Sequence, residues 1–145
     1  MRLTILLADS AQAVNGKLYI LGGGWSITGP QPSSSAIAIK IDVPWDQANI
    51  RHRIQLDLLN EDGQAVIVPT PMGERPMQII SEFEVGRPPV LTPGSDLDVA
   101  LAINIAPLPL PPGARYVWRC TINDEFHEDW KVVFSVRPAA APTQL

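Results

Sequence analysis

The chain has 145 residues, of which 46% are hydrophobic and 18% charged, a composition that fits one globular domain with its own core. A formal charge of -4 and an isoelectric point near 5.0 argue against the basic field that attracts nucleic acids and anionic lipid surfaces, so nucleic acid is not an expected partner. No stretch reaches the roughly 18 apolar residues of a membrane-spanning helix, so no membrane span is expected.

The N-terminal apolar run is too short for a secretory signal. Asp9 interrupts it after residues 3–8, whereas a signal peptide needs an apolar region of about 7 to 15 residues. We interpret this run as a strand. Cys120 is the only cysteine, which excludes an internal disulfide and favours a cytoplasmic location.

Fifteen prolines and ten glycines divide the chain into short segments, most of which alternate apolar and polar residues. This period of two is typical of strands in an antiparallel sheet, and little helix is expected. In chain order we predict strands at residues 3–8, 12–14, 17–22, 36–43, 50–59, 64–68, 78–85, 96–105, 116–122 and 130–136. Asn15-Gly16 predicts a tight hairpin turn because both residues tolerate positive φ, and residues 44–48 could make one helical turn.

Several predicted strands carry an apolar stripe on one face. The stripes consist of Ile37, Ile39, Ile41 and Val43; Leu97, Val99, Leu101, Ile103 and Ile105; Tyr116, Trp118, Cys120 and Ile122; and Trp130, Val132, Phe134 and Val136. The last two stripes form a closing hairpin, and a second sheet is needed to cover them. We therefore predict an all-β fold, a two-sheet antiparallel β-sandwich of about eight strands, immunoglobulin-like or C2-like. One domain is expected over residues 1–137, followed by a flexible tail over 138–145.

A Pro/Ser loop is predicted at residues 29–35. The longer loops are predicted at 69–76 and 86–94, and loops of this kind on a rigid scaffold commonly carry binding residues. The proline-rich run 107–112 resembles a ligand of SH3-type grooves, but its place before the last hairpin favours a stiff crossover. Gly22-Gly23-Gly24 lacks the spacing of a phosphate-binding loop and is better interpreted as a bulge or twist in a strand.

Candidate metal ligands are few. His127, Glu128 and Asp129 form the densest cluster, but on an extended chain only two of the three side chains point the same way. His52 lies between two arginines, whose charges would repel a divalent cation. We prefer a solvated strand start for the cluster, and we expect no metal, no cofactor and no catalytic residue.

Other carboxylates and nucleophiles give no clearer site. Asp96 and Asp98, with aspartates near loop ends, could provide oxygen ligands for calcium, but outward aspartates on a strand ordinarily serve solubility. Ser33 to Ser35 lie in a loop outside any nucleophile motif, and Cys120 lies on an apolar face. A metal-dependent or hydrolytic enzyme is the least favoured alternative.

Four tryptophans offer another approach to function. Trp118 and Trp130 align with apolar stripes, so we assign them to the core. Trp25 and Trp45 fall between predicted strands, where they could stack on a sugar ring or anchor a protein partner. Together with Asp46, which follows Trp45, they are the predicted contact residues.

A set of short motifs runs along almost the whole chain. It consists of Leu6-Leu7-Ala8-Asp9, Asn15-Gly16-Lys17-Leu18, LLNEDG at 58–63, LPLPPGxxYxW at 108–118, His127-Glu128-Asp129-Trp130 and Phe134-x-Val136. This set resembles a family of small bacterial proteins of unknown function. The resemblance implies a single-domain β-sandwich inside the cell and carries over no catalytic residue. Pro112-Gly113-x-x-Tyr116 before a closing hairpin also resembles immunoglobulin-like and C2-like sandwiches, which is a mark of fold.

The expected function is a non-catalytic binding or assembly module that acts through protein–protein contacts, including self-association. Exposed strand edges make the addition of a strand from another chain a natural mode of contact. The alternative from a different class is a small-ligand or carbohydrate-binding module that uses the loop tryptophans.

Overall fold

The computed structural model describes residues 1–139, and this part of the chain is all-β. Its strands are β1 (Arg2–Val14), β2 (Lys17–Gly23), β3 (Ile27–Thr28), β4 (Ser35–Val43), β5 (His52–Leu59), β6 (Ile67–Thr70), β7 (Gly73–Pro76), β8 (Gln78–Phe83), β9 (Leu97–Ile105), β10 (Arg115–Ile122) and β11 (Lys131–Val136). The only helical element among these residues is a 3-10 turn at Trp45–Gln47, as predicted for 44–48. No helix in the described part is long and apolar enough to cross a membrane. The predicted tail lies outside the described residues from position 140 on.

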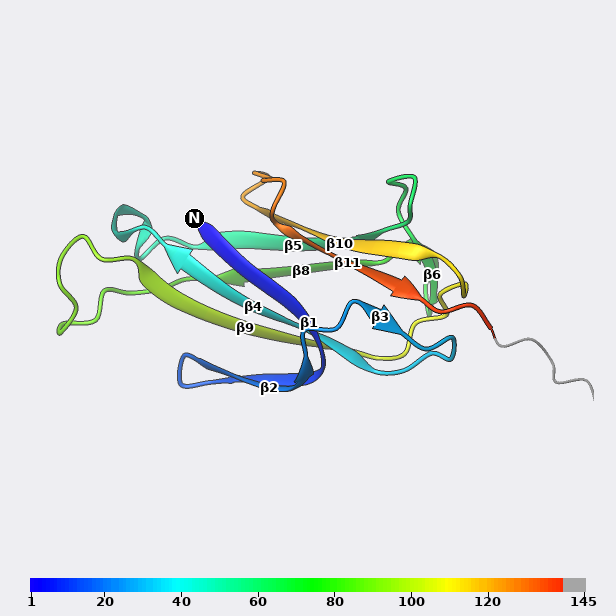
Figure 1. The fold of residues 1–145 in the computed structure, drawn as a ribbon. Helices are drawn as coiled ribbons and strands as arrows, with labels where there is room; N and C mark the ends of the chain where they lie inside the picture. The colour runs from blue at the N-terminus through cyan, green and yellow to red at the C-terminus, as the bar shows by residue number, and fades with distance from the viewer. Residues whose placement is uncertain (140–145) are drawn as a thin grey trace, which may run out of the picture.

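Two larger sheets form the body of the molecule. Sheet A has the strand order β2-β1-β4-β9, and sheet B has the order β3-β11-β10-β5-β8. They lie as two layers, with β4 and β9 on one side and β5, β8 and β10 on the other (Figure 1). Neighbouring strands are antiparallel except β3 and β11, which pair in parallel. A third, two-stranded sheet joins β6 to β7, so the all-β prediction is confirmed, but about eight strands was too low.

The hydrophobic core lies between the two layers, where the predicted stripes meet. Ile37, Ile39 and Ile41 of β4 are fully buried and share one cluster with Trp118 and Cys120 of β10. Completely burying one large apolar side chain contributes about 1.5–3 kcal/mol, so these stripes dominate the stability of the fold. Burial also raises the pKa of the Cys120 thiol to about 12, which leaves the thiol protonated and unreactive at neutral pH.

The closing hairpin pairs as its alternation predicts. Tyr116 lies opposite Phe134, and Trp118 lies opposite Val132. Trp130, just before β11, is also buried, so the assignment of Trp118 and Trp130 to the core is confirmed. The Tyr116 hydroxyl donates a hydrogen bond to the Pro111 carbonyl at 2.9 Å, which ties the proline-rich crossover to the start of the hairpin.

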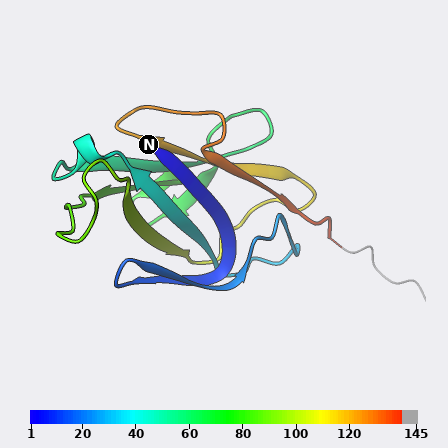
Figure 2. The same cartoon turned by 60° about the vertical axis from the view of Figure 1, so that its left-hand side comes forward.

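Strand β1 is continuous, whereas the sequence predicted two strands at 3–8 and 12–14. Its first half pairs with β4 and its second half, from Ala8 on, pairs with β2. Because the backbone of β1 pairs first with β4 and then with β2, the strand bends without ending. Figure 2 shows this wide curve in blue. The predicted turn after β1 is confirmed, with φ of 52° at Asn15 and 74° at Gly16.

A layer of alanines makes the bend of β1 sterically feasible. Ala8, Ala11, Ala36 and Ala38 form a second buried cluster, separate from the main core. Ala36 and Ala38 lie on the face of β4 opposite to Ile37 and Ile39, a face that alternation alone assigns to solvent. Their small side chains let the β1–β2 hairpin lie close to this face.

Asn104 of β9 fixes the bent part of β1. Its side-chain amide nitrogen donates to the Ala11 carbonyl at 2.8 Å, and its Oδ1 accepts from the Ala11 backbone nitrogen at 3.2 Å. A single side chain thus forms the two hydrogen bonds that a neighbouring strand would form. This pair of bonds joins β1 to a strand that is not its sheet neighbour.

The β6–β7 hairpin replaces a predicted loop. Residues 69–76 were expected to be irregular, and a strand was expected at 64–68. Instead Ile67–Thr70 pairs with Gly73–Pro76 around a tight turn at Pro71 and Met72, with φ of 99° at Gly73. Prolines within both strands concealed the pattern, because proline cannot donate a ladder hydrogen bond and usually signals an edge or a loop.

Replacing Ala38 with leucine tests the alanine layer. Ala38 is 2% exposed and lies between Leu6 and Ala102 in the register, so the larger side chain must overpack the gap. We expect a loss of about 1–3 kcal/mol in the free energy of unfolding, measured by urea denaturation. The control Ala106→Leu changes an exposed alanine and should have little effect. Equal stability of both variants would contradict close packing of β1 on β4.

Candidate binding surfaces

Trp25 follows β2 and is half-buried against sheet B. Its ring meets the ring of Phe134 edge to face, with 6.1 Å between centroids, and its Nε1 is buried without a hydrogen-bond partner among the described residues. It also lines a cavity of about 50 Å³ beneath the 28–35 segment, which has room for only a few water molecules. The cavity is therefore too small for a sugar ring to stack on Trp25 inside it.

Trp45 and Asp46 lie on the 3-10 turn after β4. The Arg87 guanidinium lies 4.7 Å above the centroid of the Trp45 ring, and its Nε and Nη2 donate to the Trp45 carbonyl at 3.1 and 2.7 Å. This contact fastens the turn to the 86–94 loop and covers one face of the ring. Asp46 is exposed.

The predicted contact residues do not share one site. Trp25 lies beside the first residue of β4 and Trp45 follows the last, and nine residues of strand span roughly 30 Å. No single ligand of modest size could contact Trp25, Trp45 and Asp46 together. Their role in binding stays a prediction.

His127 and its neighbours make local contacts. The His127 Nε2 lies 2.9 Å from the Glu125 carboxylate, the ring packs on Trp130 at 4.5 Å, and Glu128 pairs with Lys131. Within residues 1–139, no three or more histidine, cysteine, aspartate or glutamate side chains lie close enough together to hold a metal ion.

His52 is a buried structural residue. It is 3% exposed, packs on Phe83 at 5.2 Å between centroids, and has one hydrogen-bond partner for each ring nitrogen. Nε2 lies 3.0 Å from the Gln47 carbonyl and Nδ1 lies 2.9 Å from the Asn123 side-chain amide. These partners fit the neutral tautomer with its proton on Nε2. The ring thereby joins the 3-10 turn to the turn after β10.

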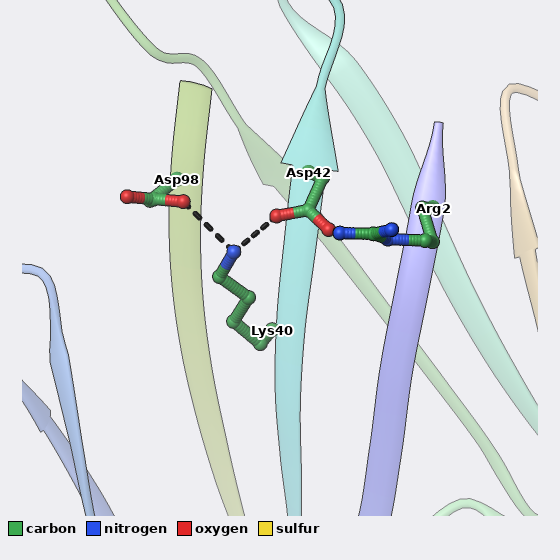
Figure 3. Close-up of polar contacts among 4 residues, drawn as sticks. All are labelled: Arg2, Lys40, Asp42 and Asp98. Atoms are coloured by element: carbon green, nitrogen blue, oxygen red, sulfur yellow. Dashed lines mark hydrogen bonds and ion pairs between the residues drawn. The ribbon is translucent and has the colours of Figure 1, made fainter. Parts of the chain in front are cut away.

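Two of the aspartates considered as calcium ligands, Asp98 of β9 and Asp42 near the end of β4, are paired with cations on sheet A. Figure 3 shows Asp98, Lys40, Asp42 and Arg2 in a row across β9, β4 and β1. The Asp42 carboxylate is 7% exposed and accepts from Arg2 Nε at 2.8 Å and from Lys40, which also lies 2.8 Å from Asp98. The Lys40 hydrogen bond, reinforced by Arg2, lowers the pKa of Asp42 despite burial, and Asp42 in turn raises the pKa of Lys40. The two carboxylates of this row are neutralised by its two cations, so the row has little net negative charge to attract a metal ion.

One edge of sheet A is formed by β2, whose side chains are largely apolar. Tyr19 is 56%, Ile20 40% and Leu21 70% exposed, and β2 pairs with β1 alone. Because β1 carries β2 over the alanine layer, β2 contributes no residue to the main core. This strand therefore presents unpaired backbone groups flanked by apolar side chains.

The outer face of sheet B holds a groove of about 560 Å³. Its floor is made by Val117 and Val133, which lie opposite each other on β10 and β11, beside Leu59 of β5. Its charged lining residues are Arg115, Arg119, Lys131, Glu61 and Glu128, and Phe126 forms part of its wall. We call this the sheet B groove. Sequence reasoning missed it, although Val117 and Arg119 lie on the outward face of the strand predicted at 116–122.

The chain matches a family model described as a family of unknown function (DUF6941) over residues 3–135. No curated protein matches it. The match confirms the relation to an uncharacterised family that the motifs indicate, and it assigns no activity to any of these surfaces.

Replacing Asp42 with asparagine tests the charged row. Because Arg2 and Lys40 are partly in water, we expect a loss of only about 1 kcal/mol in the free energy of unfolding near neutral pH. The pKa of Asp42 is lowered from 3.8, so this stabilisation is present above that pH and is lost as the pH falls through the lower value of the folded state. Urea denaturation of both proteins at several pH values should show the difference shrinking in acid.

The control for this series is Asp124→Asn. Asp124 pairs with Arg53 at 3.5 Å on the surface and is 90% exposed, so its replacement should have no measurable effect. A difference between wild type and Asp42→Asn that stays constant into acid would contradict the role assigned to the Asp42 carboxylate.

Proposed function

The chain belongs to the DUF6941 family, and since that membership assigns no activity, we propose from the geometry that it is a non-catalytic assembly module acting through protein–protein contacts. Two copies of the chain associate through the edge of β2. In this proposal the two layers form an immunoglobulin-like or C2-like sandwich that acts as the scaffold for these contacts. The observation that carries it is the apolar, unpaired edge formed by β2.

The other strand edges are protected in ways that β2 is not. Strand β9 carries Asp98 near its start, β8 carries Glu82 in an ion pair with Arg51, and β3 has only two residues. Charges and short length are the usual means by which proteins prevent unwanted strand pairing. Strand β2 has neither over its central residues, so pairing at this edge is favoured.

A second copy of the chain fits this edge by symmetry. Antiparallel pairing of two β2 strands about a two-fold axis satisfies the outward backbone groups of both copies at once. In a register centred on Ile20, Tyr19 lies opposite Leu21 of the second copy on the same face, and this contact occurs twice. Lys17 then lies opposite Gly23, so no like charges meet.

The contacts of the loop tryptophans favour this proposal over the carbohydrate-binding alternative. Sugar-binding sites need an exposed aromatic face, whereas Arg87 covers one face of Trp45 and Trp25 packs on Phe134. The two tryptophans also lie at opposite ends of β4.

Light scattering coupled to size-exclusion chromatography tests the proposal. We expect the wild-type protein to elute with twice the 15.8 kDa mass of one chain. Leu21→Lys should give the monomer mass, because it places two lysines against tyrosines at the paired edge and blocks tight strand pairing. Leu21 is 70% exposed, so the variant should keep the stability of the fold.

The matched control is Val90→Lys, which changes an apolar residue that is 96% exposed in a loop. This variant should keep the dimer mass. A wild-type protein that remains monomeric at every concentration tested, or a Leu21→Lys variant that stays dimeric, would overturn self-association through β2.

A further inference from the structure

We propose that the sheet B groove binds an acidic peptide segment, with Arg119 as the residue that binds its carboxylate. This site is independent of self-association, because the groove belongs to the outer face of sheet B and β2 belongs to sheet A. Four features of the groove carry the inference: a like-charge pair, a guanidinium without an acidic partner, an aromatic support, and an apolar floor.

The like-charge pair is set by the strand register. Arg119 of β10 lies directly opposite Lys131 of β11, on the same face of the sheet. Like charges in this position repel each other unless an anion lies between or beside them. Lys131 has such an anion in Glu128, at 2.5 Å, but Arg119 makes no ion pair with any described residue.

The nearest acid across the sheet does not neutralise Arg119. Asp57 lies opposite Arg119 on the other side, in β5. Its carboxylate oxygens accept instead from the side-chain amides of Gln55 and Gln78, at 2.8 to 3.1 Å. No ion pair within 4.0 Å joins Asp57 and Arg119. The guanidinium therefore keeps its capacity for a carboxylate.

Arg119 is positioned for such a contact. Its Cζ lies 5.6 Å from the centroid of the Phe126 ring, and its Nε is buried without a hydrogen-bond acceptor among the described residues. A guanidinium supported on an aromatic ring presents its fork of donors in a fixed direction, and that fork matches a carboxylate with two parallel hydrogen bonds. Because no described residue holds the guanidinium in a hydrogen bond or ion pair, its outer nitrogens are left to donate to an incoming carboxylate.

The lining of the groove favours a peptide carboxylate over a free phosphate. Arg115, Arg119 and Lys131 contribute three positive charges, while Glu61 and Glu128 contribute two negative charges. This balance suits a single negative charge, and the two glutamates would repel a dianion. The floor of Val117 and Val133, the latter 42% exposed, adds an apolar surface for side chains that flank the acid.

Nuclear magnetic resonance titration of the ¹⁵N-labelled full chain tests the site, because it detects weak binding. The probe is the tripeptide N-acetyl-Val-Glu-Val-amide, and its control is the uncharged peptide with glutamine in place of glutamate. We expect saturable shifts at the Arg119 Nε–H and at the backbone amides of Val117 and Val133, with the glutamine peptide at least about tenfold weaker. Equal shifts from both peptides, or none at millimolar concentration, would overturn the proposal.

Two variants assign the effect to Arg119. Arg119→Gln should weaken binding at least about tenfold, whereas Arg53→Gln, which removes an exposed arginine elsewhere on sheet B, should leave it unchanged. If Arg119→Gln fails to fold, Phe126→Leu removes the aromatic support and should weaken binding in the same direction. Unchanged binding in the folded variant used would overturn the assignment. Stronger shifts from inorganic phosphate than from the glutamate peptide would identify a general anion site and overturn the proposal that the groove binds an acidic peptide.

Discussion

The close approach of β1 to the alanine face of β4 determines most of what is unusual in this fold. A strand can bend across the outside of its own sheet only where the side chains beneath it are small. Ala36 and Ala38 provide that space, and Asn104 then fixes the bent segment by bonding to both backbone groups of Ala11. As a result β2 leaves the plane of the core and becomes an edge strand, with Leu18 packed on the alanine layer and Tyr19, Ile20 and Leu21 exposed.

The two layers contribute differently to stability and to recognition. Between the layers, the stripes of β4 and β10 form a continuous core in which Trp118 and Cys120 are almost fully buried. On the outside, sheet A offers an apolar edge, and sheet B offers a groove in which cations outnumber anions although the chain as a whole carries a charge of -4. The two contacts that we propose, self-association and binding of an acidic peptide, therefore lie on different sheets.

Much of the architecture could be predicted from the sequence, because alternation reports the two faces of a strand directly. The stripes and the buried closing hairpin followed from it, and the Asn15-Gly16 turn followed from the tolerance of both residues for positive φ. The bend of β1 did not, because alternating alanines such as Ala36 and Ala38 read equally well as a solvent face. The β6–β7 hairpin was hidden by prolines, which ordinarily end strands.

The candidate sites were harder to predict, because they depend on register and on contacts between distant residues. Arg87 covers Trp45 from 42 positions away, so a tryptophan that seemed free in a loop is partly covered. The pairing of Arg119 with Lys131 depends on the turn between β10 and β11, and no local pattern gives that register. His52, flanked by two arginines, is buried because β8 brings Phe83 against it.

Hydrogen–deuterium exchange as a function of protein concentration tests most directly whether the β2 edge is an assembly surface. The account predicts that residues 17–23 exchange more slowly as the concentration rises, while the edges at β8 and β9 exchange at constant rates. The protection should be confined to β2 and its turn, because only that edge is paired in the proposed dimer. Exchange in β2 that does not change with concentration, or protection that appears at β8 or β9 instead, would contradict it.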